Sequence, residues 1–374
     1  MPIGYLITVL LAAVCTALAI RPPHPRRSGP FRLSYWLSYQ VNEVPFVVFY
    51  WLLAATLLAF AQGDVDSVGG WAVVGLAVLT CLGLVVVVRR ALLARSVVDR
   101  ALADGLGPEW RTDVDPRLAN GLRRRLPWGR ILFAPWRIRH RDVEHVSNIS
   151  YGPAGERNLL DVYRHRSHPA DAPTLVYFHG GGFRSGRKHR EARPLLYRFA
   201  GQGWVCISAN YRLSPPAVFP DHLVDAKRVI AWAREHGRDY GIDPTTVFVA
   251  GSSAGGHLAT MAAFTSDAPV AGAISLYGYY GGLDDDPASD SSPSSQVHAD
   301  APPYFATHGD QDTIVIVEDA RRFVDQFRAT SSNPVVYAEL PGGQHSFDLF
   351  HSIRFEIVVD GVEAFAAWVR SRAD

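Results

Sequence analysis

Three uncharged, apolar stretches constrain the N-terminal part of this chain more than any other feature of its sequence. They are residues 3–20, 44–61 and 68–88, and each is about as long as the ~20 residues that a helix needs to cross a bilayer core. One such run would fit a buried helix of a globular protein. Three in succession, separated by short polar loops, predict a transmembrane region of three helices in residues 1–88.

Charged residues beside these stretches predict how the chain is oriented. No basic residue precedes the first stretch, whereas Arg21, Arg26 and Arg27 follow it, which argues against a cleaved signal peptide. Asp64 and Asp66 lie between the second and third stretches. Because arginine-rich loops remain in the cytoplasm, we expect a multi-pass protein of the cell membrane whose C-terminal region faces the cytoplasm.

Residues 89–143 form a basic segment that contains several tryptophans, among them Trp128 and Trp136. Arginine beside tryptophan next to a membrane span is typical of the headgroup region, where arginine meets anionic lipid and indole lies at the interface. We therefore expect this juxtamembrane segment to contact anionic lipids of the inner leaflet. The alternative is a solvated linker whose tryptophans pack on the following domain.

The overall composition excludes several classes of function. A net charge of +1 over 374 residues argues against a nucleic-acid partner. Cys15, Cys81 and Cys206 are too far apart for a disulfide framework or a cysteine metal site. The histidines lack the paired spacing of a zinc site, so no metal and no cofactor are expected.

From about residue 144 to the C-terminus, strand and helix patterns alternate. Short, almost uncharged runs predict strands at residues 143–151, 158–165, 174–178, 204–209, 247–250, 270–277, 304–308 and 335–340. Apolar residues at helical spacing occupy residues 221–240 and 354–370. This alternation predicts an α/β domain over residues 144–374, with a mainly parallel sheet covered on both faces.

Residues 251–255 fit the pattern G-x-S-x-G, with Gly251 and Gly255 around the central Ser253. The pattern alone is weak, because glycine and serine are common. Here it follows an apolar strand and precedes an alanine-rich helix, as a nucleophilic serine on a tight strand-to-helix turn requires. Ser253 is therefore the candidate nucleophile.

A run of three glycines follows the predicted strand at residues 174–178. It reads His179, Gly180, Gly181, Gly182 and then Phe183. Backbone N–H groups of such a run, together with the N–H of Ala254, could stabilise the anionic oxygen of a tetrahedral intermediate. A phosphate-binding loop would need G-x-x-x-x-G-K-[ST], which the chain lacks.

A serine nucleophile needs a histidine base and an acid, which follow it along the chain in this class of fold. His345 lies in a loop just past the last predicted strand, where a base is expected. Asp310 and Asp312 both follow the strand at residues 304–308, and both qualify on chemistry.

The chain from about Glu144 onward resembles the bacterial hormone-sensitive-lipase group of esterases in the α/β-hydrolase superfamily. The matching blocks are residues 179–183, 211–215, 251–256 and 308–312, together with His345. The resemblance implies Gly181 and Gly182 as the oxyanion donors and Asp312, rather than Asp310, as the acid. The N-terminal stretches resemble those of membrane-tethered actinobacterial carboxylesterases of this group. Ser252 and Pro216 depart from the group, which usually has an acidic residue at each position.

The function implied is a membrane-anchored serine carboxylesterase or lipase-like hydrolase acting on a small-molecule or lipid ester. Its triad would be Ser253, Asp312 and His345. An amidase or aryl-formamidase would use the same triad, and a catalytically silent membrane scaffold is the alternative from another class. Acyl-chain length and oligomeric state stay open.

Overall fold

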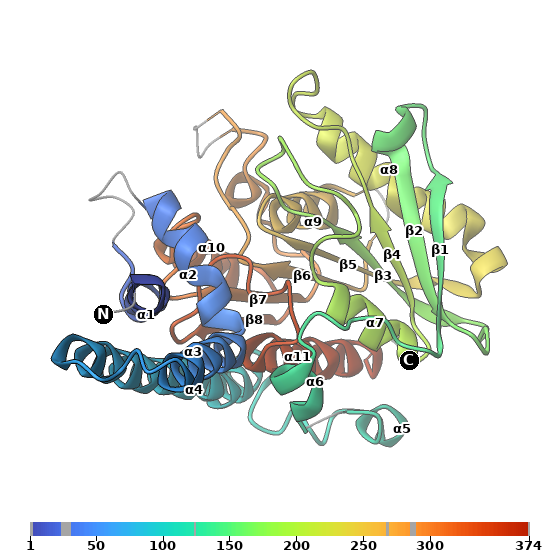
Figure 1. Ribbon diagram of the computed structural model, residues 1–374. Helices are drawn as coiled ribbons and strands as arrows, with labels where there is room; N and C mark the ends of the chain where they lie inside the picture. The colour runs from blue at the N-terminus through green and yellow to red at the C-terminus, as the bar shows by residue number, and fades with distance from the viewer. Residues whose placement is uncertain (1–2, 24–30, 123–124, 267–268, 285–288, 373–374) are drawn as a thin grey trace.

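An eight-stranded sheet organises the C-terminal region in the computed structural model (Figure 1). The structure describes residues 3–23, 31–122, 125–266, 269–284 and 289–372, so Arg26 and Arg27 lie outside the described residues. The strands are β1 (Val143–Ser150), β2 (Leu159–His165), β3 (Ala172–Phe178), β4 (Val205–Ala209), β5 (Ile242–Ser252), β6 (Gly272–Leu276), β7 (Tyr304–Gly309) and β8 (Val335–Leu340). Their order is β1-β2-β4-β3-β5-β6-β7-β8. β2 is antiparallel to both of its neighbours and every other pairing is parallel, which confirms the predicted α/β class.

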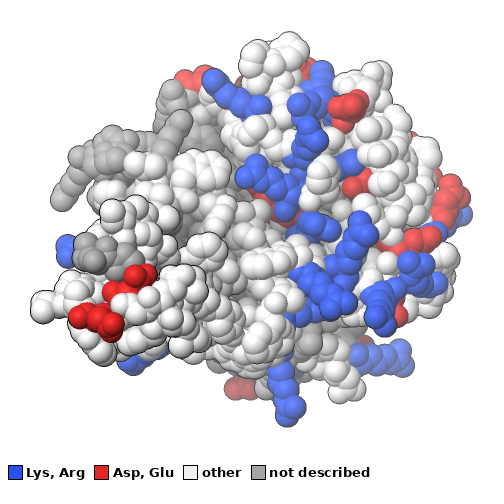
Figure 2. All heavy atoms as spheres, viewed as in Figure 1, with Lys and Arg blue, Asp and Glu red and all other residues white. Residues whose placement is uncertain are grey.

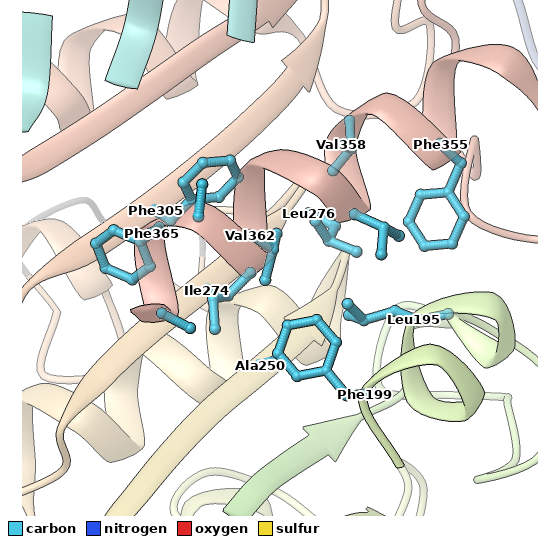
Figure 3. Close-up of a cluster of buried hydrophobic side chains, with 14 of the residues drawn as sticks. Leu195, Phe199, Ala250, Ile274, Leu276, Phe305, Phe355, Val358, Val362 and Phe365 are labelled. Carbon is cyan, nitrogen blue, oxygen red and sulfur yellow. The ribbon is translucent and has the colours of Figure 1, made fainter. Parts of the chain in front are cut away.

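Helices cover both faces of this sheet. They are α7 (Arg193–Gly201), α8 (Asp221–His236), α9 (Ala254–Thr265), α10 (Val317–Thr330) and α11 (Ile353–Arg370). α7 and α11 pack on one face, and α8, α9 and α10 pack on the other. Figure 3 shows the first face, where Val358 and Val362 of α11 lie over Ile274 of β6.

The central position of β5 in the sheet explains why its residues 247–251 are an unbroken apolar run. Val247 and Val249 belong to the core under α8 and α9, whereas Phe248 and Ala250 belong to the core under α7 and α11. All four side chains are fully buried. Successive residues of a strand point to opposite faces, so a sheet covered on both sides needs apolar residues at every position.

The N-terminal region begins with four helices. They are α1 (Ile3–Ile20), α2 (Phe31–Glu43), α3 (Pro45–Ala61) and α4 (Val68–Leu106). α1 and α4 are long and apolar enough to cross a membrane. α2 and α3 meet at a bend of 89°, and they would add a third span only if the bent pair together forms a single membrane span. The described residues therefore support two spans, or up to three. The bend follows from Pro45, which has no N–H to donate and disfavours helical backbone at Val44.

Helix α4 runs through the predicted end of the third span without a break. It contains 39 residues, or about 58 Å of helix. Beyond Arg89 its buried residues Ala94, Val98 and Leu102 join the same hydrophobic core as α11 and β8. Two short helices follow, α5 (Pro116–Ala119) and α6 (Trp128–Phe133). One rigid element thus connects the apolar N-terminal helices with the sheet.

Charged side chains are distributed unevenly over the visible face of the molecule. Figure 2 shows few charges on the N-terminal helices, apart from acidic side chains near their far end. Lysine and arginine side chains gather over the C-terminal region in the same view. Large apolar side chains such as Trp51, Leu57 and Leu79 are exposed on α3 and α4. An exposed apolar surface of this kind is typical of helices that face lipid.

Candidate active site

Ser253 lies on a strained turn between the end of β5 and the start of α9. Its backbone has φ 55° and ψ −120°, a conformation that residues with side chains rarely adopt. The turn is tight enough that a Cβ on Gly255 would lie 2.0 Å from the carbonyl oxygen of Phe178. Only glycine allows β3, β5 and α9 to approach this closely, which explains the spacing of the G-x-S-x-G pattern.

Three loops at the carboxyl ends of β5, β7 and β8 bring Ser253, Asp312 and His345 together. His345 Nε2 lies 3.0 Å from Ser253 Oγ, and His345 Nδ1 lies 2.7 Å from Asp312 Oδ2. Asp312 and His345 are buried, at 4% and 6% exposure. The serine hydroxyl can therefore pass its proton to the imidazole, and the carboxylate fixes which ring nitrogen carries the other proton.

The two candidate acids have different partners in this structure. Asp310 accepts a hydrogen bond from the N–H of Gly342 and does not reach the imidazole. Asp312 also accepts hydrogen bonds from the N–H groups of Ile314 and Val315. Burial alone would raise the pKa of the Asp312 carboxyl, but His345 and His308 hold that pKa well below its usual range. Asp312 is therefore ionised beside His345.

The glycine run after β3 exposes backbone N–H groups near the serine. Gly181 and Gly182 have φ values of 113° and 61°, a region that favours glycine. The N–H of Gly180 is already taken, because it donates to Glu191 Oε2. Within the part of the chain that the structure describes, no hydrogen bond engages the N–H of Gly181 or Gly182. The N–H of Ala254, in the first turn of α9, has no acceptor within the helix.

His179 and Tyr211 fix the start of the glycine run. The hydroxyl of Tyr211 donates to the carbonyl oxygen of His179 at 2.7 Å, and the two rings stack with centroids 4.5 Å apart. Burial lowers the pKa of His179 to about 4, so the ring is neutral at neutral pH. The imidazole acts here as a packed aromatic ring.

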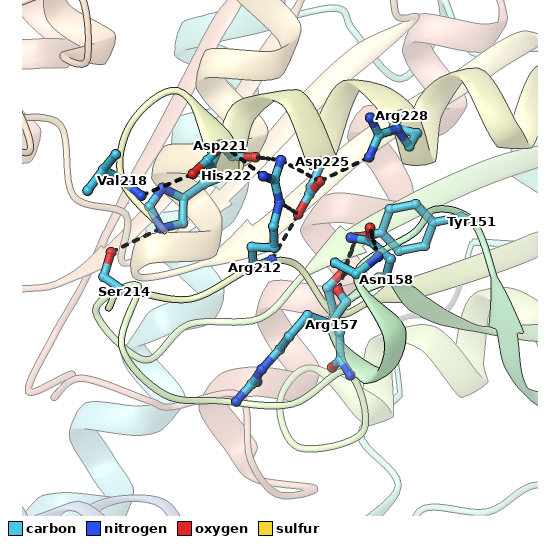
Figure 4. Close-up of polar contacts among 12 residues, drawn as sticks. Tyr151, Arg157, Asn158, Arg212, Ser214, Val218, Asp221, His222, Asp225 and Arg228 are labelled. Carbon is cyan, nitrogen blue, oxygen red and sulfur yellow. Dashed lines mark hydrogen bonds and ion pairs between the residues drawn. The ribbon is translucent and has the colours of Figure 1, made fainter. Parts of the chain in front are cut away.

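The block at residues 211–215 is anchored by an arginine network behind the site (Figure 4). Arg212 makes a two-pronged contact with Asp225, at 2.9 Å and 3.0 Å, and also binds Asp221. Both acidic residues lie on the first two turns of α8. Paired hydrogen bonds between a guanidinium and a carboxylate fix both position and angle. This network explains why the motif contains an arginine that makes no contact with the serine in this structure.

A buried carboxylate that the sequence interpretation missed lies next to the nucleophile turn. Asp348 accepts hydrogen bonds from the hydroxyls of Ser252 and Tyr277. Burial raises the pKa values of Asp348 and of Glu191, and the negative charge of Asp348 raises the pKa of Glu191 further. Only the short spacing from His345 could have pointed to Asp348, and no motif marks it.

Other polar residues near the site have structural partners. His308 Nε2 donates to the carbonyl oxygen of Val315, and His351 pairs with Glu356. His257 is buried on α9 beside Phe183. Among the described residues, no group of three or more histidine, cysteine or acidic side chains is arranged to hold a metal ion.

Comparisons with known proteins match this chain to carboxylic ester hydrolases. The family model BD-FAE matches residues 160–281, and the family model described as Phospholipase/Carboxylesterase matches residues 225–351. The chain is 36% identical to the "Probable carboxylic ester hydrolase LipM" of Mycobacterium tuberculosis, over 98% of this chain and 93% of that protein. It is 35% identical to the "Esterase LipQ" of the same species, over 62% of this chain and 64% of that protein.

A solved structure is also similar to part of this chain. It is esterase 2 of Thermogutta terrifontis phosphoramylated by tabun, which is 26% identical with a TM-score of 0.49. The overlap covers 55% of this chain and 86% of that esterase.

Proposed function

The chain belongs to the hormone-sensitive-lipase group of the α/β-hydrolase superfamily, and from this membership we propose that it is a serine carboxylesterase that forms an acyl-enzyme on Ser253. That it hydrolyses carboxylic esters follows from LipM, a relative that matches nearly the whole chain. The identity of the catalytic residues rests on one observation above all. His345 lies within hydrogen-bond reach of Ser253 on one side and of Asp312 on the other.

In the proposed reaction, Ser253 Oγ attacks the ester carbonyl while His345 Nε2 takes the hydroxyl proton. Asp312 remains ionised and stabilises the imidazolium that forms. The N–H groups of Gly181, Gly182 and Ala254 would receive the oxyanion of the tetrahedral intermediate. His345 then gives the proton to the alcohol as the ester C–O bond breaks. Water attacks the acyl-enzyme while His345 takes its proton, and that proton passes to Ser253 Oγ as the acyl–serine bond breaks and the acid leaves.

Covalent labelling with a fluorophosphonate tests this proposal directly. The probe should label the full-length protein, and Ser253→Ala should abolish both labelling and hydrolysis of p-nitrophenyl esters. A protein that is neither labelled nor active on any ester of the series would instead be the silent scaffold. Rates on matched esters and amides distinguish the esterase from an amidase or aryl-formamidase.

We further propose that the enzyme is anchored in the cell membrane by three spans, with its catalytic domain in the cytoplasm. α3 and α4 are joined by the short turn at residues 62–67 and therefore start from the same depth. The 17 residues of α3 extend about 25 Å, close to the ~30 Å thickness of a bilayer core. If α4 crosses the membrane, α3 has the length to cross beside it, and α2 then leaves α3 at 89°, along the membrane surface.

The proposed domain boundaries follow from this arrangement, with residues 1–88 as the membrane region, 89–143 as a juxtamembrane segment and 144–374 as the catalytic domain. Trp128, Phe133 and Trp136 are exposed in the juxtamembrane segment. Phe133 stacks on Tyr50 of α3 at 6.2 Å between ring centroids. Exposed aromatic rings beside a span suit the lipid interface, and arginines nearby would attract anionic lipids of the inner leaflet.

A further inference from the structure

Helix α2 contacts the loop that carries His345, although about 300 residues separate them in the sequence. The hydroxyl of Tyr35 donates to Ser346 Oγ at 3.0 Å, and the Tyr35 ring meets the His345 ring edge-on at 6.2 Å between centroids. Tyr35 and Ser346 are both buried. The contact therefore joins an N-terminal helix directly to the residue after the proposed base.

Ser346 has a backbone conformation that needs outside support. Its φ is 61°, in the left-handed region that residues with side chains rarely adopt. Such a conformation persists only where the surroundings fix it. Within the described residues, the hydroxyl of Tyr35 is the one side-chain partner of Ser346 Oγ. This bond therefore supports the strained residue next to His345.

A second contact from α2 holds the same loop on the other side of His345. Asn42 Nδ2 donates to the carbonyl oxygen of Gly342 at 2.7 Å, and Asn42 is buried. At the end of α2, Glu43 forms a buried ion pair with Arg354, and Arg354 donates to the carbonyl oxygen of Pro341. The loop at residues 341–346 is therefore tied to α2 at both ends.

From these contacts we infer that α2 is a positioning element for His345, with Tyr35 and Asn42 as positioning residues that hold the imidazole in line with Ser253. The inference rests on the proposed catalytic role of His345. Its consequence is that the N-terminal helices are part of the active site and do more than tether the enzyme. Because α2 bends into α3 at Val44, any displacement of the apolar helices moves the base relative to the nucleophile.

The test compares full-length variants purified in detergent. Tyr35→Phe retains the ring and removes the hydroxyl, and it should lower kcat for p-nitrophenyl acetate about three- to tenfold, as expected for one lost positioning hydrogen bond. KM should stay unchanged, because Tyr35 acts through His345. The rate of fluorophosphonate labelling should fall by the same factor as kcat. Tyr39→Phe, one turn along α2, is the matched control and should leave kcat within about twofold.

A double-mutant cycle identifies the route of the effect. Ser346→Ala should lower kcat as much as Tyr35→Phe does, and the double variant should be no slower than either single variant. Asn42→Asp places an acceptor against the Gly342 carbonyl and should lower kcat independently of the Tyr35 contact. Melting temperatures of all variants show whether the fold is retained.

Two outcomes would overturn the inference. One is an unchanged kcat in both Tyr35→Phe and Asn42→Asp, and the other is a loss confined to KM. A Ser253→Ala variant that still hydrolyses the ester would instead refute the proposed function, so failure of the positioning role and failure of the triad give different results.

Discussion

The hydroxyl of Ser252 donates a hydrogen bond of 2.6 Å to the carboxylate of Asp348, which joins the nucleophile turn to the loop of His345. Tyr277 donates to the other oxygen of the same carboxylate. Ser252 occupies a position where the resembling esterases usually carry aspartate. In this chain, a carboxylate from the loop between β8 and α11 lies beside that position.

Removing this carboxylate should destabilise the enzyme. In Asp348→Ala, the hydroxyls of Ser252 and Tyr277 would be buried without an acceptor, which should cost about 2–4 kcal/mol of unfolding free energy. Thermal unfolding in detergent measures the effect. Ser252→Ala removes its hydrogen bonds to Asp348 and from Tyr177. It should cost only about 1–2 kcal/mol, because the hydroxyl of Tyr177 is still within 3.5 Å of Asp348. Equal melting temperatures for Asp348→Ala and the parent would contradict the expected role of Asp348.

The nucleophile assignment predicts a contrast between adjacent serines. Ser253→Ala should lower kcat by about 10⁴-fold or more, because no other group can form the acyl-enzyme. Ser252→Ala should retain most of the activity, since its hydroxyl points to Asp348. Kinetics on a short p-nitrophenyl ester measure both variants. An inactive Ser252→Ala beside an active Ser253→Ala would move the nucleophile.

The choice of acid predicts a similar contrast between two aspartates. Asp312→Asn should lower kcat by about 10⁴-fold. The amide stabilises the wrong tautomer of His345, and it has no negative charge to stabilise the imidazolium that forms in the reaction. Asp310→Asn should lose far less, since Asp310 accepts from the backbone N–H of Gly342 and not from His345. The assignment to Asp312 fails if the larger loss in kcat belongs to Asp310→Asn.

Two buried histidines predict loss of stability in acid. Burial lowers the pKa values of His179 and His257 to about 4, below the usual value of 6.5. The unfolded chain therefore binds more protons than the folded one between these values. Each histidine contributes stability that is present above pH 6.5 and is lost as the pH falls toward 4, worth roughly 2–4 kcal/mol.

Melting temperature measured from pH 7 to pH 4 checks this prediction. His257→Gln should flatten the decline, whereas His236→Gln, at an exposed position on α8, should leave it unchanged. An identical decline in His257→Gln and in the parent protein would exclude His257 as a cause.

The proposed topology predicts where the two ends of the chain lie. With three spans, a reporter fused after Asp374 should be active in the cytoplasm, and one placed before Ile3 should be active outside. A second experiment examines the turn at residues 62–67, where Asp64 and Asp66 should be accessible from outside the cell. A C-terminal reporter that is active only outside would refute the cytoplasmic orientation, because it would require an even number of spans or the reverse insertion.

The sequence by itself determined the class of fold and most of the site. The apolar run at residues 247–251 of β5 needs a sheet covered on both faces, because strand residues alternate between faces and no polar residue interrupts this run. The pattern around Ser253 identifies a tight strand-to-helix turn, since only small residues allow that approach. These features are local, so spacing along the chain encodes them.

Other features depended on contacts between distant parts of the chain. Sequence chemistry left Asp310 and Asp312 equivalent, and the tertiary structure brings only Asp312 to His345. No motif predicts that Tyr35 and Asn42 reach the loop of His345, or that Asp348 receives the hydroxyl of Ser252. The sequence shows no periodic pattern for such pairs. Their distance in space depends on how α2, α4 and the sheet pack together. The sequence determines the chemistry of each side chain, but the packing of the fold determines which other residue that side chain contacts.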